Sequence, residues 1–356
     1  MNEKLAFEVD FHPVGDGEKG GDAITIQYGK LNSCNEFVEK KVIVIDGGTL
    51  ASGKKIVEHI KAFYKTTKVD LVVNTHPDND HCSGLRVVIN ELLVKEIWMH
   101  QPWISSNDFL ELFKDGRITC NSLKERLKDA LNVVSEIEGL ARSKNIKLKE
   151  PFAGLTFDDG VITILGPTKN FYKELLPAFR STPEPVNESF SANIFSMGKD
   201  IIQMEDETME VETLDASGQT SPENNSSVIS LFSYAENKFL FTGDAGIPAL
   251  QQAIYFASKK QIALDNLSCL QVPHHGSKRN ICPDILNSIK AKRAYISCPK
   301  QGDPKHPSKK VTNALNRRGV SVLQTKGKIL CNRFNTQMRE GYASATLIPF
   351  YNQVEK

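Results

Sequence analysis

The residues with the clearest potential for chemistry lie at positions 74–81, in the run Asn-Thr-His-Pro-Asp-Asn-Asp-His. In an extended chain, residues two apart point to the same side. This rule gives one face to three ligand-type residues, His76, Asp78 and Asp80. His81 joins them as the chain turns into a following helix. Imidazoles and carboxylates at this density predict a metal site. A solvated polar turn is the alternative, because Pro, Asn and Asp are common turn residues.

Two later segments favour the metal interpretation. Asp244 follows an apolar run and is flanked by glycines at 243 and 246, and His274 and His275 follow another apolar run. Helix capping by Asp244 is an alternative, as are hydrogen-bonded structural histidines. However, five of the eight histidines lie in such strand-end segments, at positions 76, 81, 274, 275 and 306. This clustering favours one shared site.

The composition is that of a globular protein, and it bounds the functions that fit. The chain has 356 residues, 40% hydrophobic and 24% charged, with a net charge of +1, which lacks the basic footprint of extended nucleic-acid contact. Seven cysteines without a C-x-x-C pair argue against a disulfide framework or a zinc ribbon. Neither a signal peptide nor a membrane span is recognisable. We therefore expect a cytoplasmic protein.

The elements that must position these residues alternate between strands and helices. Apolar runs predict strands at 23–28, 41–45, 69–73, 96–99, 160–165, 227–234, 238–242, 269–272, 294–297 and 321–324. Helical spacing is found at 53–65, 84–94, 105–144, 171–179, 283–290 and 309–317. This order predicts a layered α/β protein. We expect one domain, 1–356, with a helical insertion at 105–150 and a lid or flexible insertion at 168–223.

The motifs together resemble the metallo-β-lactamase superfamily, and within it the ComEC-like branch. The segment from His76 to His81 has that branch's H-x-D-x-D-H form. Further segments are similar to the branch's other motifs: 14–23, 45–48, 224–227, 242–244, 274–277 and 306–308. The resemblance extends from about residue 10 to residue 327 and implies an αββα four-layer sandwich with the site at one edge of its two sheets.

The resemblance also implies a role for each ligand residue. His76 and Asp78 would hold a first ion, and Asp80, His81 and His275 a second. Asp244 would bridge the two ions. His275 is chosen over His274 because the superfamily ligand directly precedes the glycine. Asp46 would orient ligands from behind.

The chain departs from the wider superfamily at one ligand position. Many members supply a further histidine where this chain has none, between His100 and His274. Asn224 or Asn225 is a candidate to fill part of that gap. The resulting oxygen-rich set suits one or two divalent ions, with Mn²⁺ as plausible as Zn²⁺.

The predicted chemistry is attack by a metal-activated water. Asp80 would hold and orient that water. His274 and His306 would serve the leaving oxygen. Three residues are candidates for phosphate binding, although a solvated basic loop explains them equally well: Ser277, Lys278 and Arg279.

Three functions from different classes fit these residues. The first is a phosphodiesterase or nuclease acting on single-stranded nucleic acid or a nucleotide. The second is a hydrolase of an amide, lactam or thioester, since fold alone does not select the bond. The third is a non-catalytic partner within a larger complex, for example a bacterial defence or DNA-processing system. The complete ligand set favours an enzyme.

Overall fold

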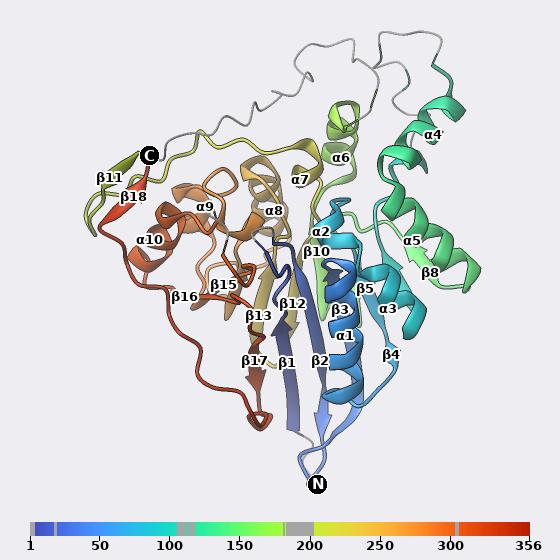
Figure 1. The fold of residues 1–356 in the computed structure, drawn as a ribbon, viewed down its shortest axis with the longest axis horizontal. Coiled ribbons are helices and arrows are strands. Elements are labelled where there is room, and N and C mark those ends of the chain that lie inside the picture. Colours follow the sequence, from blue (N-terminus) through green and yellow to red (C-terminus); the bar gives the residue numbers. More distant parts are fainter. Residues whose placement is uncertain are drawn as a thin grey trace.

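Two seven-stranded sheets form the centre of the computed structural model, which describes residues 4–17, 20–104, 110, 113, 118–180, 182, 203–302 and 306–356 (Figure 1). The first sheet contains, in spatial order, β17 (Leu330–Phe334), β1 (Lys4–Phe11), β2 (Ala23–Leu31), β3 (Phe37–Gly47), β5 (Leu71–Val73), β7 (Glu96–Trp98) and β8 (Lys147–Lys149). The second contains β16 (Ser321–Gln324), β15 (Arg293–Ile296), β14 (Cys269–Gln271), β13 (Asn237–Phe241), β12 (Ile229–Tyr234), β10 (Ile162–Gly166) and β9 (Thr156–Phe157).

Helices cover the outer face of each sheet. The first sheet packs against α1 (Leu50–Ala62), α3 (Leu85–Glu91), α4 (Cys120–Ala130) and α5 (Asn132–Ser143). The second packs against α8 (Ile247–Lys259), α9 (Pro283–Ser288) and α10 (Lys309–Arg317). The smaller elements are α2 (Asn79–Cys82), α6 (Lys169–Leu175), α7 (Pro222–Asn225) and the strand pairs β4 (Lys68–Val69) with β6 (Leu93–Val94) and β11 (Met204–Asp206) with β18 (Gln353–Glu355).

Alternating side chains on the strands create three apolar interfaces. On β3, Val42 and Val44 pack with the helices of the first sheet, whereas Ile43 and Ile45 pack in the cluster between the two sheets. A period of two is what a strand buried on both faces requires. The helix–sheet, sheet–sheet and sheet–helix interfaces make four layers, which confirms the predicted αββα fold.

Parallel pairing brings the ligand segments to one edge of each sheet. In the first sheet, β3, β5 and β7 are parallel neighbours, so Asp46 at the end of β3 and His76 and His100 after β5 and β7 lie at the same edge. In the second sheet, β13 and β14 are parallel, and Asp244 and His275 follow them. Carboxyl ends of parallel strands are where α/β proteins bind ligands.

Most predicted strands and helices are present, with one break, but several elements were not predicted. These include β1, β8, β9, β11, β17, β18, α7 and α8. The pattern at 105–144 is not one continuous helix: Leu131 has φ −113° and ψ 44° and separates α4 from α5. Parts of both predicted insertions lie outside the described residues (105–109, 111–112, 114–117, 181 and 183–202). Within the described part of the chain, no helix has the length and apolar character to cross a bilayer.

Candidate metal centre

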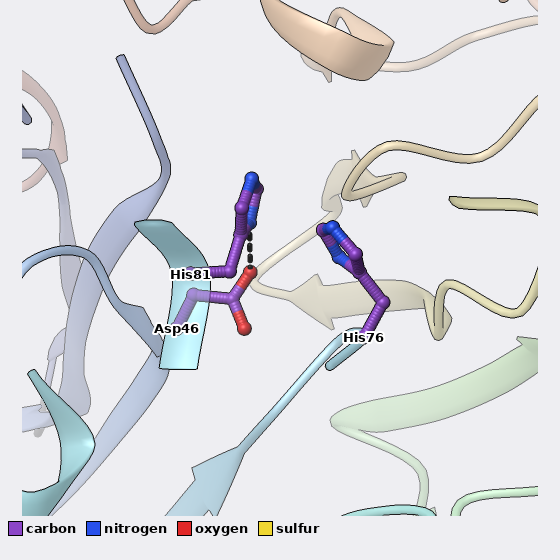
Figure 2. Close-up of side chains that lie close together, drawn as sticks. All are labelled: Asp46, His76 and His81. Carbon is purple, nitrogen blue, oxygen red and sulfur yellow. Dashed lines mark hydrogen bonds and ion pairs between the residues drawn. The ribbon is translucent and has the colours of Figure 1, made fainter. Parts of the chain in front are cut away.

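Asp46 fixes the orientation of two histidines at the sheet edge. It is fully buried and has φ 56°. Its Oδ1 accepts the Thr75 backbone N–H at 2.8 Å, and its Oδ2 accepts the Thr75 hydroxyl at 2.6 Å and His81 Nδ1 at 2.8 Å. Figure 2 shows the contact between Asp46 and His81, with His76 beside them. Because its oxygens already accept hydrogen bonds, Asp46 suits a positioning role.

The same network fixes the tautomer of His76. The Thr75 hydroxyl donates its proton to Asp46, so its oxygen accepts the N–H of His76 Nδ1 at 3.0 Å. Both His76 and His81 therefore turn Nε2 away from the Asp46 network. These two Nε2 atoms are buried and have no hydrogen-bond partner. An orphaned pair of buried imidazole nitrogens costs free energy unless another group binds them.

Asp244 faces both orphaned nitrogens with different oxygens. Its Oδ1 lies 3.4 Å from His81 Nε2, and its Oδ2 lies 3.7 Å from His76 Nε2. Two ligand atoms held roughly 2.1 Å from a shared tetrahedral ion lie roughly 3.4 Å apart. The gaps are thus too long for hydrogen bonds and of the size that a divalent ion spans. The residues fit a metal centre.

His274 also faces this centre. Its Nε2 lies 3.7 Å from the same Asp244 Oδ2, and its Nδ1 lies 3.0 Å from Asn280 Oδ1. Because Oδ1 of Asn280 only accepts, Nδ1 of His274 carries the proton and Nε2 is left for the site. His274 and His275 both have positive φ, 48° and 55°, a conformation that is rare outside glycine and concentrated at functional sites.

A second group of ligand atoms gathers around His81. Asp80, His81 and His275 offer ligand atoms within 4.8 Å of one another, and so do Asp22, His81 and Asp244. Sequence reasoning missed Asp22 as a site residue, although we noted its glycine-rich segment. Its signal was weak, because Asp22 precedes β2 and only folding brings its Oδ1 to 4.0 Å from His275 Nδ1.

The electrostatics of the cluster favour a cation. Burial raises the pKa of Asp22 to about 8, and the nearby carboxylates of Asp244 and Asp46 add to the rise. Although burial opposes protonation, Asp244 and Asp46 raise the pKa of His81 well above its ordinary value. Burial also opposes ionisation of Asp244, but the charges of His81 and His274 lower its pKa. Converging buried carboxylates thus demand a positive charge, which protons or a metal ion supply.

Arg180 connects the segment after α6 to residues 74–81, the metal loop. Its guanidinium pairs with Asp78 Oδ1, and its Nε lies 3.1 Å from Glu223 Oε1. The other oxygen of Asp78, Oδ2, lies 3.7 Å from His76 Nε2. Although burial opposes it, the contact with His76 lowers the pKa of Asp78, and Arg180 adds to this effect. Sequence analysis did not single out Arg180.

The remaining candidates lie around His274. Asn224 is buried, and its Nδ2 lies 3.3 Å from His274 Nδ1. Asn225 instead lies against Gly246, where an added Cβ would stand 2.4 Å from Asn225 Oδ1. The His306 ring lies 5.4 Å from the His274 ring. Ser277 is buried beneath this turn, whereas Lys278 and Arg279 line a neighbouring cavity.

This arrangement of metal-ligand residues agrees with the protein family that the sequence matches. The family model of the metallo-beta-lactamase superfamily matches residues 36–298. The chain therefore belongs to this superfamily of metal-dependent hydrolases, whose members bind divalent metals, typically zinc.

Curated relatives indicate the ComEC-like branch. The chain is 29% identical to ComE operon protein 3 of Bacillus subtilis over 127 residues, which are 35% of this chain and 16% of that protein. It is 28% identical to Recombination protein 2 of Haemophilus influenzae over 137 residues, which are 38% of this chain and 16% of that protein. The chain thus matches a small part of each relative's length.

Solved structures with a similar backbone fold include a diphosphatase of the PhnP family and a metallo-beta-lactamase superfamily protein from Sulfolobus tokodaii. The first is 10% identical with a TM-score of 0.41, covering 93% of this chain and 99% of the other. The second is 16% identical with a TM-score of 0.31, covering 78% and 83%.

Proposed function

We propose that this protein is a metal-dependent phosphodiesterase or nuclease that cleaves with a metal-activated water. In this proposal His76 and Asp78 hold a first divalent ion, and Asp80, His81 and His275 hold a second. Asp244 lies between the two groups. The ion supplies positive charge and lowers the pKa of water, which provides a nucleophile near neutral pH.

The observation that carries the proposal is the placement of the Asp244 carboxylate. Each of its oxygens faces a different orphaned imidazole nitrogen, 3.4 Å from His81 and 3.7 Å from His76. Paired metal sites that share a carboxylate in this way are suited to phosphoryl chemistry, because both the attacking and the leaving oxygen need positive charge.

The chain's own residues complete the chemistry. Asp80 is partly exposed at the start of α2, where its carboxylate would accept a hydrogen bond from the attacking water. His274, with an unprotonated Nε2 toward the site and 30% of its side chain exposed, would take up the proton that the attacking water loses and pass it to the leaving oxygen. His306 would assist from beside His274.

Two further observations support a phosphodiester substrate. Counting Asp244, the first ion would have two carboxylate ligands, Asp78 and Asp244, and one imidazole ligand, His76. Such a set suits hard cations and oxygen-rich substrates such as phosphates. One curated relative is named Recombination protein 2, and recombination is a process that acts on nucleic acids. Lys278 and Arg279, three and four residues beyond His275, add positive charge near the site.

The test is a substrate panel with matched variants. Wild type, Asp80→Asn and Asp265→Asn would each be incubated with single-stranded DNA, single-stranded RNA, a small phosphodiester, a lactam and a thioester, in Zn²⁺, Mn²⁺ or EDTA. We expect cleavage of a phosphodiester that falls at least about a hundredfold in EDTA and in Asp80→Asn. Asp265, an exposed residue before β14 at the opposite end of the strand from His275, controls for the loss of one carboxylate.

Two results would contradict the proposal. One is turnover of the lactam or thioester alone, which would assign the protein to a different hydrolase class. The other is equal phosphodiester cleavage by wild type and Asp80→Asn, which would trace the activity to a contaminant or another site.

A further inference from the structure

A cavity of about 270 Å³ lies beside the metal centre, and its lining is unusually basic. Four cationic side chains contribute to it, Lys278, Arg279, Lys310 and Lys356, against a single acidic one, Asp215. Its volume is at the lower limit of small-molecule pockets. It therefore suits a compact anionic group rather than a whole nucleotide chain.

The cavity is built by close contact between distant segments. Its outer wall is residues 213–219, which follow β11 and lead to α7 (Figure 1). A Cβ on Gly218 would stand 2.5 Å from the Arg279 Cα, so the two backbones touch there. Lys310, on the first turn of α10, is almost fully buried behind this wall and pairs with Glu205 at 2.6 Å.

Lys278 lies close to two further cationic side chains of the lining, Lys310 and Arg279. Its Nζ donates to the Lys356 backbone oxygen at 2.5 Å. Burial and the repulsion of Lys310 and Arg279 lower the pKa of Lys278, despite the opposing charges of Glu355 and Asp215. A bound anion would relieve this repulsion.

The cavity adjoins the metal centre through two chain segments. Lys278 follows His275 by three residues, so their Cα atoms are at most about 11 Å apart. Directly after the outer wall, Thr220 accepts a hydrogen bond from Asn224 at 2.7 Å, and Asn224 contacts His274. With at least about 3.4 Å of strand per nucleotide, this upper limit corresponds to at most about three nucleotides.

We propose that this cavity binds a backbone phosphate of a nucleic-acid strand, within about three nucleotides of the bond cleaved at the metal centre. Lys278 provides the positive charge, since Lys310 is paired with Glu205, and Asp215 limits the affinity. The inference rests on the proposed function and narrows it, because it selects polynucleotides over mononucleotides and small phosphodiesters as substrates.

The experiment measures binding separately from cleavage. The metal-loaded full chain is titrated into a fluorescein-labelled 12-residue oligothymidylate with phosphorothioate linkages, which resist hydrolysis, and into the corresponding dinucleotide. Anisotropy gives the Kd at several salt concentrations. For Lys278→Ala we expect about fivefold to tenfold weaker binding of the 12-mer, a smaller loss for the dinucleotide, and a salt slope reduced by about 0.7.

Two further variants serve as controls. One should change the affinity in the opposite direction, and the other removes the same charge at a distant position. Asp215→Asn keeps the oxygen that accepts from Ser217 N at 2.8 Å and removes the acid, so binding of the 12-mer should tighten about twofold to fivefold. Lys54→Ala removes the same charge as Lys278→Ala from an exposed position on α1 and should change the Kd less than about twofold. Equal effects of the two lysine variants, or no tightening in Asp215→Asn, would overturn the inference.

Failure of this inference differs from failure of the proposed function. If wild type cleaves phosphodiesters but the variants bind the 12-mer alike, the cavity is not a phosphate site and the enzyme class stands. If the variants follow the expected pattern without any cleavage, the cavity binds the strand and the proposed activity is wrong.

Discussion

At the scale of single residues, Asp46 combines complete burial, a left-handed backbone and three accepted hydrogen bonds. Through Thr75 and His81 it decides which nitrogen each imidazole of the metal loop presents. Hydrogen-bond partners of a metal-ligand histidine affect metal affinity because they set the tautomer and orientation of its ring. We therefore propose that Asp46 contributes to metal affinity by orienting these imidazoles.

We predict that Asp46→Asn lowers metal affinity by about tenfold to a hundredfold. The amide would direct N–H groups at one of the present donors, Thr75 or His81, so one imidazole would lose its orientation. Competition of the protein with a fluorescent zinc chelator measures the effect without reference to turnover. Asp265→Asn provides the matched control, and equal affinities in both variants would refute a positioning role for Asp46.

At the scale of elements, the metal loop is held by close contact between the end of β3 and the start of α3. A Cβ on Gly84 would lie 2.0 Å from the Gly47 carbonyl oxygen, and one on Gly53 of α1 would lie 2.4 Å from the Gly84 carbonyl oxygen. Only glycine allows backbones to approach this closely. The contact fixes β3, and with it Asp46, against the start of α3, which in turn contacts α1.

The same substitution should therefore have opposite effects at two glycines. Gly84→Ala should destabilise the protein by about 3 kcal/mol or more, because the obstacle is backbone that cannot yield. Gly139→Ala, within α5 and with nothing within 4 Å of the added Cβ, should stabilise it by about 0.5–1 kcal/mol. Urea denaturation measures both changes, and a neutral Gly84→Ala would contradict the close approach.

At the scale of the whole molecule, a buried polar network joins the first strand to the segment after β17. Arg339 donates to Asp10 of β1 at 2.8 and 2.9 Å, and Tyr64 donates to the same carboxylate at 2.7 Å. Thr25 bridges Tyr64 to His12, with 2.9 Å contacts on both sides. Buried ionic groups of this kind persist only when each has its partners.

His12 makes this network sensitive to acid. Burial lowers the pKa of His12 to about 3, and the positive charge of His59 adds to the effect. The unfolded chain takes up this proton near pH 6.5, so between these values the unfolded state binds more protons than the folded one. The free energy of unfolding therefore falls as the pH drops below about 6.5.

For wild type, His12 should account for about 2 kcal/mol of the stability lost between pH 7 and pH 5. In His12→Gln the loss over the same interval should be smaller by this amount. Urea denaturation at the two pH values, in EDTA, measures the difference. Thr25→Val removes a hydrogen-bond partner of His12 but no titrating group, so it should keep the wild-type pH dependence. Parallel behaviour of wild type and His12→Gln would contradict the assignment.

Local patterns in the sequence predicted a layered α/β protein, and the resemblance of the motifs predicted the four-layer fold and the family. Apolar runs such as 41–45 carry their own geometry, because alternation along a strand already specifies two buried faces. The segment 74–81 concentrates ligand-type side chains at a strand end, so its chemistry is readable from a few adjacent residues. By contrast β1 was missed, because Glu8 and Asp10 interrupt its apolar pattern, and Arg339, which pairs with both, lies more than three hundred residues away.

The sequence by itself thus determined most of the strands and helices and which residue types could hold a metal, because these properties depend mainly on neighbours along the chain. Only the tertiary structure decided which nitrogen of each histidine faces the centre, that Asp22 joins His81 and that His274 turns toward Asp244. Those outcomes depend on hydrogen bonds and backbone crossings between residues far apart in the chain, such as Asp46 with His81 and Asn280 with His274. Spacing along a single segment carries no information about them.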